Sequence, residues 1–74
     1  GEPEDTLAAI DKLIAEKKPT GAALQEAVFM KGSILFQSDK AKAKEFLLEA
    51  QKLAPESETG KRIDGILERF FKDE

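Results

Sequence analysis

Apolar and polar residues alternate along this chain with the period of an α-helix, in four separate segments. In the first segment, Leu7, Ile10 and Ile14 recur at intervals of three and four residues, which places them on one helical face. No segment alternates with a period of two, and β-branched residues are few, so no strand is predicted. We expect an all-α fold with helices over residues 5–18, 21–37, 39–54 and 57–72.

The stretch from Leu24 to Phe36 is the most apolar part of the chain. Its apolar residues cover nearly the whole circumference of a helix, which is typical of a helix surrounded by others. Phe29 and Phe36 lie together on another side of this helix. The pattern is compatible with two roles for these side chains: packing in the core, or lining an exposed binding groove. We expect the core to include Leu24, Ala27, Val28, Met30, Ile34 and Leu35.

Gly32 lies deep inside this apolar segment. A glycine in a helix interior costs about 1 kcal/mol relative to alanine. Gly32 is either a tolerated weak point or a position where a neighbouring helix approaches the backbone closely, and packing favours the second interpretation.

Capping residues and prolines mark the joints between the helices. Pro19 and Pro55 end the first and third helices, because the residue before a proline avoids helical angles. The short joint over residues 37–39 makes the second and third helices an antiparallel hairpin. The predicted caps are Asp5 or Thr6, Thr20, Ser38 or Asp39, and Ser57. The four helices would then form two stacked αα-hairpins, arranged either as a stretch of superhelix or as a compact four-helix bundle.

The third and fourth helices each carry an apolar stripe that can cover the second helix. Leu48 points away from the stripe of the third helix, and with the edges of the fourth helix it leaves spare apolar surface, so a homodimer is an alternative to a monomer. The stripe residues are Ala43, Phe46, Leu47, Ala50 and Leu53 in the third helix, and Ile63, Ile66, Leu67, Phe70 and Phe71 in the fourth.

The residue types needed for most catalysis are missing. The chain has no cysteine and no histidine, which removes the thiolate, the usual general base and the usual metal ligand. Asp64 and Glu68 lie one helical turn apart, but Lys61, Arg69 and Lys72 are close to them, and a salt-bridged solvent face accounts for all five. We therefore expect no enzyme activity, no cofactor and no metal site.

The charge balance also limits the possible partners. The chain of 74 residues has 15 acidic and 12 basic side chains, a net charge of −3, which does not favour a nucleic-acid ligand. Lys40, Lys42 and Lys44 crowd the start of the third helix, where a solvated face accounts for them. No apolar run approaches the ~20 residues of a membrane span, and no signal peptide is visible. We expect a soluble single domain or a piece of a larger protein, for which the cytoplasm and a bacterial periplasm are both compatible.

The spacing of small, large and proline residues carries a family resemblance. Pro19 and Pro55 lie 36 residues apart, and each is followed within two residues by a capping hydroxyl. Between them, the residues that match a repeat pattern are Gly32, Leu35, Ala43, Leu47, Ala50 and Pro55. Over residues 26–55 the chain resembles the tetratricopeptide repeat, although Val28 and Lys31 stand where that family usually has tryptophan and leucine.

The resemblance implies a non-catalytic module that binds a peptide or a partner domain. The first helix of the unit would then line a concave face, with groove positions at Glu26, Phe29, Ser33, Phe36 and Gln37. The basic residues with which some family members hold a C-terminal carboxylate are absent from these positions, so an acidic tail is not the expected ligand. The alternative is a structural or dimerisation appendage of a larger redox or catalytic protein.

Overall fold

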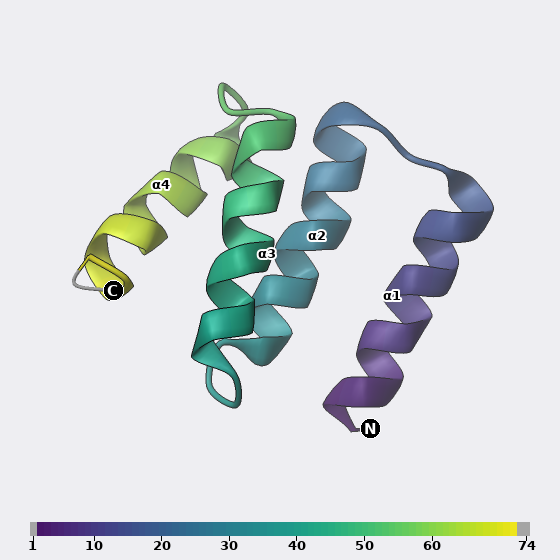
Figure 1. The fold of residues 1–74 in the computed structure, drawn as a ribbon. Coiled ribbons are helices and arrows are strands. Elements are labelled where there is room, and N and C mark those ends of the chain that lie inside the picture. The colour runs from purple at the N-terminus through teal and green to yellow at the C-terminus, as the bar shows by residue number, and fades with distance from the viewer. Residues whose placement is uncertain (1, 73–74) are drawn as a thin grey trace.

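A computed structural model describes residues 2–72, which form four α-helices (Figure 1). These are α1 (Pro3–Lys17), α2 (Gly21–Leu35), α3 (Lys40–Leu53) and α4 (Glu58–Phe70). No strand occurs within residues 2–72. The prediction of an all-α, four-helix fold is confirmed.

The helices run up and down in a row that follows their order in the chain (Figure 1). α2 packs most extensively on α3, α3 packs on α4, and α1 packs on α2 alone. The dimensions of 35 × 28 × 14 Å give a flattened shape. α1 does not pack on α4, so the first and last helices of the row do not meet.

The short joints are closed by side-chain caps at two of the predicted positions. Asp39 accepts a hydrogen bond from the backbone N–H of Lys42 at 3.1 Å, and Ser57 accepts one from Gly60 at 2.9 Å. Each bond satisfies one of the otherwise unpaired N–H groups in a first helical turn. The caps predicted at Asp39 and Ser57 are therefore confirmed.

The first two helices, α1 and α2, begin without a side-chain capping hydrogen bond. α1 begins at Pro3 with Glu2 in the capping position, so the cap predicted at Asp5 or Thr6 was wrong. Proline suits a first helical position because it has no N–H to leave unpaired. Thr20 does occupy the capping position of α2, but its side chain makes no capping hydrogen bond.

The main core lies between α2, α3 and α4, and α1 remains outside it. Its fully buried members are Val28, Leu47, Ala50, Ile63 and Phe71. The expected core residues Leu24, Ala27, Ile34 and Leu35 are half-buried. Met30 was wrongly predicted to be core: its side chain is 52% exposed, because α3 covers the opposite side of α2.

Gly32 is the point where α2 and α3 cross. A Cβ atom built on Gly32 would lie 3.2 Å from Cδ2 of Leu47 and 3.3 Å from the carbonyl oxygen of Ala43. Contacts that short require a neighbour to move, so the bare backbone is what lets the two helices approach. The close approach expected at Gly32 is confirmed.

Gln25 is a fully buried polar residue that joins three elements, and the sequence analysis missed it. Its Nε2 donates hydrogen bonds to the carbonyl oxygens of Ala50 and Ala54, each at 2.9 Å. Its Oε1 accepts a hydrogen bond from the hydroxyl of Ser57. Gln25 therefore holds α2 against the end of α3 and the start of α4, which fixes where α4 begins relative to α2.

Candidate functional site

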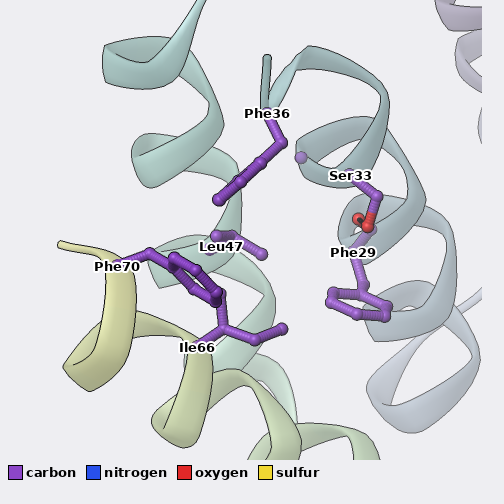
Figure 2. A pocket seen from close by; sticks show the side chains of 7 residues that line it. Phe29, Ser33, Phe36, Leu47, Ile66 and Phe70 are labelled. Atoms are coloured by element: carbon purple, nitrogen blue, oxygen red, sulfur yellow. Dashed lines mark hydrogen bonds between the residues drawn. The ribbon is translucent and has the colours of Figure 1, made fainter.

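An open apolar groove of about 270 Å³ lies between α2 and α4 (Figure 2). Phe29 and Ser33 form one wall, and Ile66 and Phe70 face them from the other. Leu47 of α3 lies between the walls and forms the floor, together with the bare backbone of Gly32. The full lining is Phe29, Gly32, Ser33, Phe36, Leu47, Ile66 and Phe70.

Two side-chain contacts join α2 and its C-terminal cap to α4, one near each end of α4. At one end, the hydroxyl of Thr59 donates a hydrogen bond to the carboxylate of Glu26. At the other end, the rings of Phe36 and Phe70 meet edge to face, with centroids 5.4 Å apart and planes at 84°. These two contacts set the separation of the helices along the groove.

Phe36 is held in place by a second ring and by a cation. It packs edge to face on the buried ring of Phe71, with centroids 5.8 Å apart. The ammonium of Lys40 lies 5.2 Å from the Phe71 centroid and 6.0 Å from that of Phe36, within the range of a cation–π interaction. Phe70 stays 45% exposed beside these anchored rings, so it is the part of the rim that a partner can reach.

The structure brings three of the five predicted groove residues together. Phe29, Ser33 and Phe36 line the groove, whereas Glu26 and Gln37 are exposed outside the lining. Phe29 and Phe36 pack against the main core, and both also line the groove. The hydroxyl of Ser33 donates to the carbonyl oxygen of Phe29 at 3.0 Å, one turn earlier in the same helix.

The α4 wall was not predicted, because Ile66 and Phe70 were assigned to a core stripe. Next to that wall is a second hollow of about 230 Å³ on the same helix. It is lined by Arg62, Gly65, Ile66, Arg69 and Phe70. The sequence did carry a signal for this hollow: Arg62 and Arg69 are seven residues apart, which places both on one side of a helix.

The salt-bridged face predicted for α4 is not present in the described part of the chain. None of Lys61, Asp64, Glu68, Arg69 and Lys72 forms an ion pair with another residue between 2 and 72. Arg69 follows Glu68 directly and lies five residues after Asp64, and neither spacing brings side chains face to face on a helix. The arginine is instead turned toward the groove side of α4.

The groove is lined mainly by apolar side chains. Among residues 2–72, no group of three or more histidine, cysteine, aspartate or glutamate side chains is arranged to hold a metal ion. The groove volume is below the roughly 300–1,000 Å³ typical of small-molecule sites, so it suits individual side chains of a partner better than a whole ligand. No helix in the described region has both the length and the apolar character to cross a membrane.

We compared the chain with protein-family models, with curated proteins and with solved structures, and none of the three comparisons found a match.

Proposed function

We propose that this chain is a non-catalytic protein-binding module with a tetratricopeptide-like arrangement of helices. Its groove between α2 and α4 would take apolar side chains of a peptide or of a partner domain. The observation that carries the proposal is the open apolar groove with Phe70 on its rim. A partner that covered the exposed part of this ring would gain about 2 kcal/mol from hydrophobic burial.

The order of the helices supports the same proposal. α2 and α4 are alternate members of the row and run in the same direction, and α3 lies between them and packs on both (Figure 1). In a tetratricopeptide-like array, the first helix of each unit lines the concave face. With α2 and α3 as one unit, α4 would be the first helix of the next, and the groove would lie on that concave face.

A second candidate function is that of a structural or dimerisation appendage of a larger protein. It is favoured by apolar side chains that are exposed outside the groove, namely Leu13 at 53%, Met30 at 52% and Leu48 at 40%. These residues lie on three different helices. The groove is the larger continuous feature, and we therefore place peptide binding first.

Selection from a peptide library tests the proposal directly. We would select displayed random peptides of about 15 residues, roughly four helical turns, on the immobilised chain. The selected peptides would then be titrated into isotope-labelled protein, and the backbone amide shifts followed. We expect the largest shifts at Phe29, Ser33, Ile66 and Phe70. A failure to select any peptide, or shifts confined to α1 and the outer side of α3, would contradict the proposal.

A further inference from the structure

The apolar groove and the arginine-lined hollow form one continuous surface. They share Ile66 and Phe70, and the exposed ring of Phe70 separates them. A ligand side chain that packs on Phe70 from the groove therefore brings its neighbours within reach of the hollow.

Arg62 and Arg69 are the charged groups of this hollow. Both side chains are exposed, and neither forms an ion pair or a hydrogen bond with another described residue. Gly65 lies between them on the helix, and a Cβ atom there would meet nothing within 4 Å. The helix surface between the two arginines is therefore open at Gly65.

The other charges around the groove do not cancel these two. The carboxylate of Glu26 already accepts a hydrogen bond from the hydroxyl of Thr59. Asp64 and Glu68 lie outside both linings. The two arginines are therefore the charged side chains in the linings of the groove and the hollow, although the whole chain has a net charge of −3.

We propose that the groove and the hollow together bind an acidic amphipathic helix of a partner protein. The inference rests on the function proposed above and specifies the class of ligand. An amphipathic helix presents apolar anchors at intervals of three and four residues, with its charges on the flank of that stripe. Its anchors would pack on Phe29, Ile66 and Phe70, and its flanking carboxylates would reach Arg62 and Arg69.

The geometry sets the spacing of the ligand's acids. Arg62 and Arg69 are seven residues apart, which on a helix is about 10.5 Å or two turns. The partner helix should therefore carry two carboxylates about two turns apart. Arginine favours carboxylates because its planar guanidinium can donate two parallel hydrogen bonds. The acidic tail that was not expected from the sequence is one held by basic residues on the first helix of the unit, whereas Arg62 and Arg69 lie on α4.

The composition of the selected peptides is the first test. We expect aspartate and glutamate to be enriched over the unselected library, on one flank of an apolar stripe. Groove-binding peptides without acidic enrichment would overturn this inference and leave the proposed function standing. If no peptide binds the groove, both fail. Binding to vesicles of anionic lipid through the same arginines, with no peptide selected, would also overturn the inference in favour of a membrane surface.

Charge reversal is the second test. We expect R62E/R69E to bind a selected acidic peptide about tenfold more weakly, given the modest strength of exposed ion pairs. The control K61E/K72E changes the net charge equally, at one residue of α4 and one residue just after it, both outside the lining of the hollow. It should bind as the unmodified chain does. Circular dichroism checks that both variants fold. Equal affinities of the two variants, or an affinity that does not fall with added salt, would contradict the inference.

Discussion

At the scale of single residues, Gly60 is the position with the least tolerance for a side chain. It lies in the first turn of α4, where a Cβ atom would overlap the carbonyl oxygen of Ala54 and come within 2.8 Å of that of Pro55. Both obstacles are backbone atoms, so relief would require the joint between α3 and α4 to move. That joint also holds Ser57 against Gln25.

The pair Gly60→Ala and Gly65→Ala tests this steric argument. Alanine favours a helix interior by about 1 kcal/mol over glycine, so helix propensity alone would make both variants more stable. We expect Gly65→Ala to gain about 0.5–1 kcal/mol, because its new methyl group meets open space. Gly60→Ala should lose about 1–3 kcal/mol through the clash. Urea denaturation measures both, and a gain in stability for Gly60→Ala would contradict the structure.

Gln25 provides a second residue-scale prediction. Replacing it with leucine keeps most of the volume but removes the donor to Ala50 and Ala54 and the acceptor for Ser57. Unpaired buried polar groups cost about 1–3 kcal/mol, so Gln25→Leu should lower the free energy of unfolding by that amount. Gln37→Leu is the control, since Gln37 is exposed, and should change stability by less than about 0.5 kcal/mol. Equal effects of the two changes in urea denaturation would show that the buried network contributes nothing.

At the scale of single residues, the sequence predicts features that depend on local position and misses those that depend on distant partners. Asp39, Ser57 and Gly32 were identified because a cap and a helix crossing need particular residue types at particular local positions. Gln25 was missed because its three partners lie 25 to 32 residues away, and a glutamine at a core-facing position looks like a surface residue until they are placed.

At the scale of elements, α1 is the most weakly attached helix. It packs on α2 alone, and its one fully buried residue, Ile10, is not part of the main core. An ion pair adds a further contact: the ammonium of Lys31 lies 2.6 Å from the carboxylate of Asp11 and 4.5 Å from the Phe46 ring centroid. Exposed pairs of this kind contribute little, since Asp11 is 59% exposed.

The weak attachment of α1 predicts unequal effects of two otherwise similar substitutions. Ile63→Ala opens a cavity in the main core and should cost about 2–5 kcal/mol. Ile10→Ala can cost no more than the free energy that holds α1 in place, because that helix can open while α2 to α4 remain folded. We expect a loss of at most about 1–2 kcal/mol in urea denaturation, and faster amide exchange in α1 than in α3. Similar losses for both variants would mean that α1 is an integral part of the core.

The apolar periodicity predicted each helix, and the observed bounds differ from the expected ones by no more than two residues at either end. The α4 wall of the groove could not be predicted in the same way. Ile66, Leu67 and Phe70 form one stripe in the sequence, and only the angle at which α4 leaves α3 determines which of them stay accessible (Figure 1).

At the scale of the whole molecule, the stacked row explains why a groove exists. In a compact bundle, four helices share one core and cover each other's apolar faces. In this row, α2 and its C-terminal cap contact α4 near each end of α4, and the groove between them remains open to solvent. The arrangement of the helices thus creates the candidate site.

The same arrangement predicts the state of the chain in solution. The exposed apolar side chains outside the groove belong to three different helices, and isolated surface apolar residues are normal in monomers. We expect sedimentation at a low and a high protein concentration to give the mass of one chain in both cases. A mass that rises to that of a dimer would favour the alternative of a dimerisation appendage.

The central claim is that the groove between α2 and α4 binds a partner's apolar side chains, and a blocking substitution tests it most directly. Ser33 lies exposed on the groove wall, so Ser33→Trp would fill the groove without removing a core side chain. Ser38→Trp places the same indole in the exposed joint before α3 and serves as the control. The measurement is the Kd of one selected peptide for the unmodified chain and for both variants. We predict that Ser33→Trp weakens binding about tenfold or more, equivalent to about 1.4 kcal/mol, while Ser38→Trp leaves it unchanged. Undiminished binding by Ser33→Trp would contradict the claim.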